Sequence, residues 1–191
     1  MGETIIIDDF IGGFEAYRDI LDSHIFGGVQ SPVDGVFYKG VSADIPQYVA
    51  DNIKANLDLY YENVEIKYQF VRISQEGIFA PHGAHNDASM STHSCMLYLN
   101  RTEDCTGGTS FVSHVDEGMP YGPENDEQLK VWQLDSSNEN KWNIDEIATM
   151  KPNRAVMFES DRMHRAEPMN GFGRTTKDAR LVLVTFFDAD A

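Results

Sequence analysis

The sequence predicts an α+β protein in which most of the regular structure is β, arranged as an antiparallel sandwich or jelly roll. Two stretches with helical spacing of apolar residues come first, and from Val64 onward apolar and polar residues alternate with a period of two. A chain of 191 residues with 41% hydrophobic residues suits one domain with one sizeable core. No linker or internal repeat divides it, so we expect a single domain over residues 1–191.

The first third of the chain is predicted to supply one short strand and two helices. Residues 4–7 form an apolar run typical of a short buried strand, and the next apolar residues have helical spacing, namely Phe10, Phe14, Tyr17 and Leu21. A second helix is predicted with Asp44 as its cap and Pro46 in its first turn, because one apolar stripe follows, namely Ile45, Val49, Ile53 and Leu57. We expect both helices to pack against a sheet.

The remaining two thirds are predicted to be mainly strands. Val64, Ile66, Tyr68 and Phe70 alternate with polar residues, and further strand candidates are 94–100, 108–114, 143–149, 154–159 and 180–187. Residues 116–150 form an irregular acidic stretch that is too long for a simple turn. A segment of this kind inside a compact domain is either a functional lid or a solvated surface insertion.

The formal net charge of −16 bears on the partners that the protein can have. Such a surface repels a nucleic-acid backbone, and no basic groove is evident, so we expect neither nucleic acid nor a membrane as a partner. No apolar run approaches the roughly 18 residues of a membrane span, and no signal peptide is evident. The two cysteines make no disulfide framework, so a cytoplasmic protein is expected.

The stretch from Pro81 to Asp87 carries the candidate metal ligands. His85 and Asp87 are two positions apart, so in an extended segment both side chains point to the same side. One further histidine would complete the set of two histidines and one carboxylate that binds Fe(II) and leaves positions open for a co-substrate and dioxygen. The chain holds a second such triplet, His114-Val115-Asp116, so the triplet alone decides nothing.

Several downstream features accompany the first triplet. They are Tyr98-Leu99-Asn100, Gly107-Gly108-Thr109-Ser110-Phe111, His164 after the strand 154–159, and Arg180 at the head of an apolar strand. Alternation along that last strand would point the Arg180 guanidinium inward, where burial costs several kcal/mol unless a carboxylate meets it. Either a ligand carboxylate held in a bidentate pair or an acidic residue of the protein could meet this need.

The order of these motifs resembles the Fe(II)/2-oxoglutarate-dependent dioxygenase superfamily, above all its prolyl-hydroxylase-like branch, from about Val64 to Phe187. The resemblance implies a double-stranded β-helix (jelly roll) with N-terminal helices packed against the sheet and iron at its open end. It implies three iron ligands and two residues that bind the distal carboxylate of 2-oxoglutarate, namely His85, Asp87 and His164 for iron and Arg180 and Tyr98 for the carboxylate. It further implies dioxygen as a co-substrate and ascorbate as a stimulant.

Three departures from the family pattern leave alternatives open. His82 competes with His85 as the first ligand, although the His-x-Asp spacing favours His85. Arg174 lies ten residues after His164, where relatives often carry their basic residue, but Arg180 begins a strand and is preferred. Arg174 and Arg180 together are also similar to the paired arginines of AlkB-type nucleic-acid demethylases. His114 and Asp116 follow the Gly-Gly-Thr strand, where the family has no ligands, so we expect a structural role for them.

The resemblance implies an enzyme that couples oxidative decarboxylation of 2-oxoglutarate to hydroxylation of an unactivated C–H bond, with succinate and CO2 as co-products. The substrate classes left open are a peptide or protein side chain and an amino-acid-like small molecule. Two other functions are kept as alternatives. One is a non-catalytic jelly-roll binding module, and the other is an AlkB-type nucleic-acid oxidative demethylase.

Overall fold

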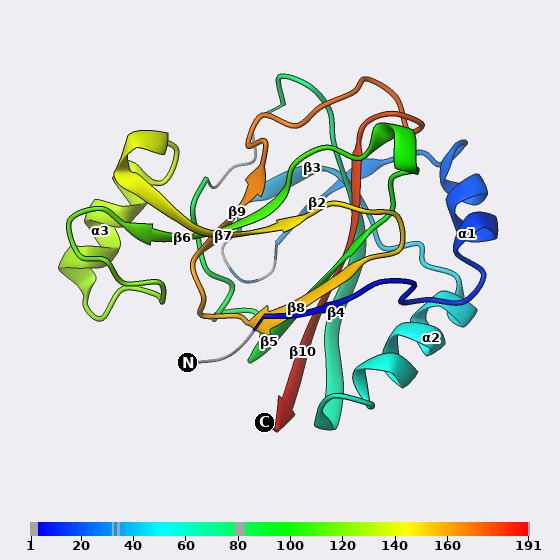
Figure 1. The fold of residues 1–191 in the computed structure, drawn as a ribbon, viewed down its shortest axis with the longest axis horizontal. Helices are drawn as coiled ribbons and strands as arrows, with labels where there is room; N and C mark the ends of the chain where they lie inside the picture. Colours follow the sequence, from blue (N-terminus) through cyan, green and yellow to red (C-terminus); the bar gives the residue numbers. More distant parts are fainter. Residues whose placement is uncertain (1–3, 32, 34, 79–82, 191) are drawn as a thin grey trace.

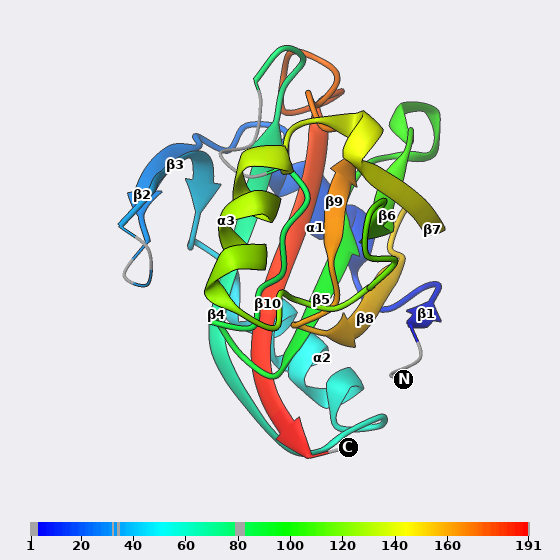
Figure 2. The ribbon, with the colours of Figure 1, turned by 90° about the vertical axis from the view of Figure 1, so that its left-hand side faces the viewer.

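A computed structural model describes residues 4–31, 33, 35–78 and 83–190 of the chain. Its strands form two antiparallel sheets that pack face to face (Figures 1 and 2). The major sheet has seven strands in the order β1-β8-β5-β10-β4-β3-β2, and the minor sheet has three in the order β7-β6-β9. The expected mostly-β fold with antiparallel sheets is confirmed.

The major sheet contains β1 (Ile5–Ile7), β2 (Gly27–Gln30), β3 (Phe37–Ser42), β4 (Glu62–Ser74), β5 (His93–Tyr98), β8 (Ala155–Glu159) and β10 (Arg180–Asp190). The minor sheet contains β6 (Gly108–His114), β7 (Trp142–Thr149) and β9 (His164–Glu167). The helices are α1 (Phe14–Leu21), α2 (Gln47–Leu57) and α3 (Asp126–Asp135), with short 3-10 turns η1 (Thr102–Asp104) and η2 (Glu139–Lys141).

Strand β10 is buried on both faces, which explains why its sequence is a continuous apolar run rather than an alternating one. Leu181, Leu183 and Phe187 pack in the core formed with α1 and α2. Val182 and Val184 point to the opposite face, into the core between the two sheets. Figure 1 shows the resulting layers, with α1 and α2 on one side of the molecule and α3 at the opposite end.

Two details of the N-terminal third differ from the sequence prediction. The strand predicted at residues 4–7 exists as β1, but it pairs only with β8 at the edge of the sheet, and Ile6 is 39% exposed. Helix α2 begins after Pro46, which is its N-cap, and no side chain caps it. The proposed cap, Asp44, therefore lies before the helix start, because the chain remains extended through Pro46.

Strand β4 does not keep one apolar face over its whole length, as the alternation from Val64 to Phe70 predicted. A bulge at Lys67 places one extra residue on β4, since Phe186 pairs with Tyr68 but Phe187 pairs with Ile66. Ile66 consequently packs against the helix-side core, whereas Phe70 packs between the sheets. The residues after the bulge thus alternate in the opposite sense to the residues before it.

The acidic stretch 116–150 is more ordered than the sequence indicated. Strand β7, which agrees with the strand predicted at 143–149, ends this stretch and pairs along β6, whereas helix α3 was not predicted. Helix α3 begins after Asn125, whose side chain accepts hydrogen bonds from the backbone N–H groups of Glu127 and Gln128.

Among the helices in the described part of the chain, none combines the length and apolar character that a membrane span requires.

The buried side chain of Asn100 fixes the start of β10. Its Nδ2 donates to the carbonyl oxygen of Ala179 at 2.8 Å, and its Oδ1 accepts from the backbone N–H of Leu181 at 2.9 Å. These two residues flank Arg180, so the amide of Asn100 sets the backbone from which the Arg180 side chain projects. This contact gives the asparagine of the Tyr-Leu-Asn motif a structural role.

Replacing Asn100 by alanine is expected to lower the free energy of unfolding by about 2–4 kcal/mol, because it leaves two buried backbone groups without partners. Urea denaturation followed by circular dichroism measures this change. Asn140→Ala in the exposed η2 turn is the control and should leave stability nearly unchanged. An Asn100→Ala protein as stable as the wild type would show that water replaces both hydrogen bonds.

Candidate metal centre

The metal loop, residues 83–87, and the first residue of β9 are joined by backbone hydrogen bonds. His85 and His164 form an isolated antiparallel bridge in which each N–H donates to the other's carbonyl oxygen, at 2.9 and 2.8 Å. The N–H of Asp87 donates to the carbonyl oxygen of Ser160 at 2.6 Å. These contacts bring together three side chains that are far apart in the sequence.

The three side chains converge on one point. The carboxylate of Asp87 lies 3.7 Å from Nε2 of His85 and 3.2 Å from Nε2 of His164. One ligand atom from each of the three lies within 4.8 Å of the others, and no other trio of His, Cys, Asp or Glu in the described part of the chain does so. The structure therefore brings together the three residues that the sequence predicted as iron ligands.

The second nitrogen of each histidine ring is held by the backbone. Nδ1 of His85 lies 2.8 Å from the carbonyl oxygen of Gly83, and Nδ1 of His164 lies 2.9 Å from that of Arg162. Because a carbonyl oxygen can only accept, each Nδ1 must carry the proton, which leaves the lone pair of the neutral ring on Nε2. Metal-binding histidines are typically oriented in this way.

This arrangement fits a divalent transition metal. Nε2 of His164 is buried and has no hydrogen-bond partner, although the Asp87 carboxylate is close to it. A neutral Nε2 and a carboxylate are both acceptors, so bringing them together is unfavourable unless a cation lies between them. Two imidazoles and one carboxylate on one side of such a cation form the set that suits Fe(II).

Aromatic rings and the turn after α3 hold the ligands in place. The ring of His164 packs edge-on against Phe158, with ring centroids 4.8 Å apart. On the other side, the carbonyl oxygen of Ser136 accepts a hydrogen bond from the N–H of Ala84 at 2.8 Å. A Cβ atom at Gly83 would lie 2.1 Å from the same oxygen, so only glycine fits at this position of the metal loop.

Arg180 and Tyr98 are neighbours in the core between the two sheets. Nη2 of Arg180 donates to the carbonyl oxygen of Gly108 at 3.1 Å, and the Tyr98 hydroxyl lies 2.9 Å from both Oγ1 of Thr109 and the carbonyl oxygen of Ala148. Burial lowers the pKa of Arg180 to about 10, and the neighbouring Tyr98 acts against this shift. Burial also raises the pKa of Tyr98.

The Arg180 guanidinium has an incomplete set of partners. Its Nε is buried without a hydrogen-bond partner, and no carboxylate among the described residues forms an ion pair with it. An internal salt bridge, which the sequence left open, is therefore not formed within the described part of the chain. A ligand carboxylate would complete the hydrogen bonding of this guanidinium.

The remaining candidates lie elsewhere. The Arg174 side chain is 85% exposed and lies 3.7 Å from Glu76. Nε2 of His114 lies 3.2 Å from Asp135, and its ring stacks on that of Trp132, so His114 belongs to the core beneath α3. Asp116 instead faces Lys141 at 3.5 Å. His82, the alternative first ligand, lies outside the described residues.

Sequence reasoning missed Arg72, which lies on the inner face of β4. Its Nε is buried and has no hydrogen-bond partner, and its guanidinium carbon lies 5.8 Å from the centre of the Tyr38 ring. The Lys67 bulge concealed it, because the face of β4 that points inward changes at that residue. In the sequence, Arg72 continues the alternation two residues after Phe70, but this indicates only that the two share a face and not that this face lies between the sheets.

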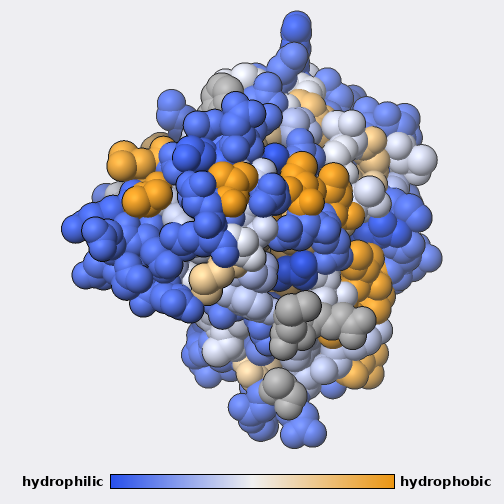
Figure 3. Space-filling model, turned by 60° about the vertical axis from the view of Figure 1, so that its left-hand side comes forward, coloured by the Kyte–Doolittle hydropathy of each residue, from blue (hydrophilic) through white to orange (hydrophobic). Residues whose placement is uncertain are grey.

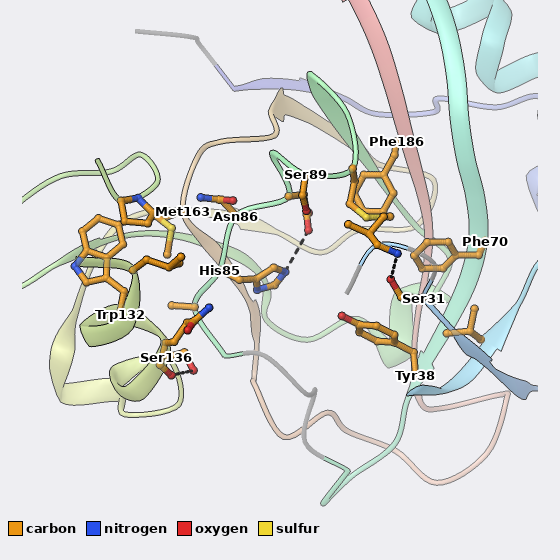
Figure 4. Close-up of a pocket in the computed structure, with 18 of the residues that line it drawn as sticks. Ser31, Tyr38, Phe70, His85, Asn86, Ser89, Trp132, Ser136, Met163 and Phe186 are labelled. Carbon is orange, nitrogen blue, oxygen red and sulfur yellow. Dashed lines mark hydrogen bonds and ion pairs between the residues drawn. The ribbon is translucent and has the colours of Figure 1, made fainter. Parts of the chain in front are cut away.

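A cavity of about 540 Å³ opens beside the three candidate ligands. Figure 4 shows His85 pointing into it, with Phe186, Phe70 and Tyr38 on one side and Trp132 on the other. Its walls come from the metal loop and Ser89, the β2–β3 hairpin, the inner face of the major sheet, and α3. The residues that line these walls include Val29, Ser31, Val33, Val41, Asn86, Met90, Leu129, Gln133 and Met163. Most of these residues are apolar, whereas the face shown in Figure 3 is largely hydrophilic with separate hydrophobic patches.

Comparison with known structures shows the fold. A 2OG-Fe(II) oxygenase family protein from Burkholderia pseudomallei is 13% identical, with 96% of this chain and 84% of that chain covered and a TM-score of 0.54. A Trichoplax adhaerens prolyl hydroxylase bound to a hypoxia inducible factor peptide is 14% identical, with 97% and 83% covered and a TM-score of 0.52. The expected jelly roll is thus confirmed.

A third structure, HygX from Streptomyces hygroscopicus with nickel, 2-oxoglutarate and hygromycin B bound, is 12% identical, with 97% and 82% covered and a TM-score of 0.55. No curated protein matches the sequence significantly. The model of the 2OG-Fe(II) oxygenase superfamily matches residues 68–188, which is more than half of the chain. The chain therefore belongs to the 2OG-Fe(II) oxygenase superfamily and is an iron- and 2-oxoglutarate-dependent dioxygenase.

Proposed function

We propose that this single-domain dioxygenase hydroxylates an unactivated C–H bond in a peptide or protein side chain or in an amino-acid-like small molecule. We also propose that His85, Asp87 and His164 hold the iron. The observation that carries the proposal is the convergence of their ligand atoms within 4.8 Å beside an open cavity. The two carbonyl oxygens that fix the histidine tautomers support the same assignment.

In this proposal, the protein residues of the site bind iron and 2-oxoglutarate. Bound iron would supply the oxidation of the C–H bond, with 2-oxoglutarate and dioxygen as co-substrates: one oxygen atom enters the hydroxylated product and the other enters succinate, which forms with CO2. Arg180 binds the distal carboxylate of 2-oxoglutarate, since the guanidinium is buried and its Nε lacks a partner. Tyr98 donates to the same carboxylate when its hydroxyl proton turns to it from the carbonyl oxygen of Ala148. Asp87 supplies a carboxylate, so the protein fills all three of its ligand positions, which favours hydroxylation over halogenation.

The character of the cavity supports both substrate classes. Its walls are mostly apolar, with a few polar side chains that can orient a bound molecule, such as Ser31, Asn86, Ser89 and Gln133. A molecule with an aliphatic part and a peptide or amino-acid backbone matches these walls. Among proteins of the same fold, the T. adhaerens enzyme was crystallised with a peptide and HygX with hygromycin B.

Replacing any one of the three ligand residues by alanine is expected to abolish stoichiometric Fe(II) binding and succinate formation. The reason is that two remaining ligands cannot hold the ion in a fixed geometry. Metal analysis of the purified variants measures the first effect. The second is measured in a screen for substrate-stimulated succinate production over peptides, free amino acids and nucleosides.

His24→Ala and Asp116→Ala are the matched controls and should keep wild-type iron content. The wild-type enzyme should respond to peptides or free amino acids. Stimulation by nucleosides alone would favour the nucleic-acid demethylase alternative. Full iron content in His85→Ala together with its loss in His82→Ala would show that His82 is the first ligand.

We propose further that a lid covers bound substrate and lies within the acidic stretch 116–150. Strand β7 is part of the minor sheet, so the movable part lies within residues 116–141, which include α3. Its movement keeps the contact between Ser136 and Ala84 that holds the metal loop. This segment places Leu129, Trp132 and Gln133 in the cavity wall, while its acidic residues remain largely exposed. Closure of such a segment would exclude water from the reacting centre.

If this segment is a lid, limited proteolysis of the substrate-free enzyme should cut first within residues 116–141. A substrate found in the succinate screen should slow that cleavage, because the closed lid is packed on the substrate. Cleavage at other sites gives the internal control. Equal protease resistance with and without substrate would show that α3 is a fixed part of the fold.

A further inference from the structure

The side chain of Arg72 enters the space between the two sheets. Its neighbours along β4, Val71 and Ile73, pack in the core beneath α1 and α2, so Arg72 must point the opposite way. Across the sheet it is paired with Val182 of β10, which belongs to the core between the sheets. Val182 is in turn paired with Tyr98, so Arg72 and Tyr98 flank the same residue.

Arg72 lies within electrostatic reach of both ends of the proposed site. Burial lowers the pKa of Arg72, and the negative charge of Asp87 acts against this shift. The charge of Arg72 in turn contributes to the lowered pKa of Arg180. Arg72 thus interacts with both groups, the Asp87 carboxylate at the iron end and the Arg180 guanidinium deep in the core.

The interior therefore holds two guanidinium groups that form no ion pair with any residue the structure describes. No ion pair to Arg72 or Arg180 forms within the described part of the chain, and the Nε atom of each is buried without a partner. Burying two like charges is unfavourable unless anionic groups meet them. A ligand with two carboxylates at opposite ends has the charge that this interior lacks.

We propose that Arg72 is a second carboxylate-binding residue of the co-substrate pocket, which contacts the carboxylate beside the keto group of 2-oxoglutarate. Arg180 contacts the distal carboxylate, so the inference rests on the role proposed for Arg180 above. A carboxylate of the primary substrate is the other conceivable partner. Near Arg72, the wall of the open cavity is formed by Tyr38, Val41 and Phe70, and Arg72 is not part of it. Because the primary substrate would occupy this cavity, we favour the co-substrate as the partner of Arg72.

The test compares two ligands by anaerobic isothermal titration of the Fe(II)-loaded enzyme. The first ligand is 2-oxoglutarate, and the second is 2-oxovalerate, which keeps the keto acid end but lacks the distal carboxylate. Arg72→Met should weaken binding of both ligands by a similar factor, roughly tenfold or more, because both carry the carboxylate that Arg72 contacts. Arg180→Met should weaken binding of 2-oxoglutarate and leave binding of 2-oxovalerate nearly unchanged.

The control variants separate a contact with the ligand from a loss of structure. Arg174→Met removes an exposed arginine and should bind both ligands as the wild type does. Arg72→Lys keeps the charge and loses the planar fork, so its affinity for both ligands should lie between those of wild type and Arg72→Met. Arg72→Gln provides a second neutral variant in case Arg72→Met fails to fold, and iron content and melting temperature are measured for every protein.

Each remaining outcome has a defined meaning. Wild-type affinity of Arg72→Met and Arg72→Gln for both ligands would overturn the inference, and so would a loss confined to 2-oxoglutarate. If Arg72→Met weakens neither ligand while Arg180→Met weakens 2-oxoglutarate, the proposed function stands and only the role of Arg72 is wrong. If neither variant changes binding, the proposed co-substrate site is itself misplaced.

Discussion

The two backbone hydrogen bonds between His85 and His164 are the contact on which the site depends. They join a loop that precedes β5 to the first residue of β9, and they place both rings on the same side of the resulting ladder. The carbonyl oxygens of Gly83 and Arg162 then fix the ring tautomers, so that the backbone alone determines which nitrogen faces Asp87. The main chain therefore sets the ring tautomers, and packing of Phe158 on the His164 ring supports its orientation.

Burial of β10 on both faces gives the interior its shape and its charge pattern. The helices α1 and α2 cover one face, and the minor sheet covers the other. The inner face has apolar residues in its middle, Arg180 at its start, and Arg72 on the neighbouring strand. The candidate metal ligands lie beyond this apolar middle, so the interior has a cationic end and an end that can hold a metal ion.

Much of this fold could be predicted from the sequence, because a strand or helix with one buried face has apolar residues at regular spacing. Strands β4, β5, β6, β8 and β10 were found from apolar runs or alternation, whereas β3 and β9 were not predicted. Strand β2 was missed because all four of its residues are exposed and show no apolar period. Helix α3 was missed because only Trp132 in it is buried, so its one visible signal was the Asn125 cap.

In the candidate site, the metal ligands were predicted from the sequence but Arg72 was not. The His-x-Asp triplet alone was ambiguous, but the order of the later motifs resembles the superfamily, and this resemblance identified His85, Asp87 and His164. Arg72 could not be identified in this way, because its orientation depends on a bulge that inserts one residue into β4. A single inserted residue reverses the face of every residue after it, and no pattern in the β4 sequence marks the insertion.

The central claim is that His85, Asp87 and His164 hold one iron ion. A crystal structure of the enzyme grown anaerobically with Fe(II) and 2-oxoglutarate tests it most directly, with iron located by its anomalous scattering. We expect one iron per chain, bonded to Nε2 of both histidines and to a carboxylate oxygen of Asp87. Iron bonded to His82 in place of His85, or to either histidine through Nδ1, would contradict it.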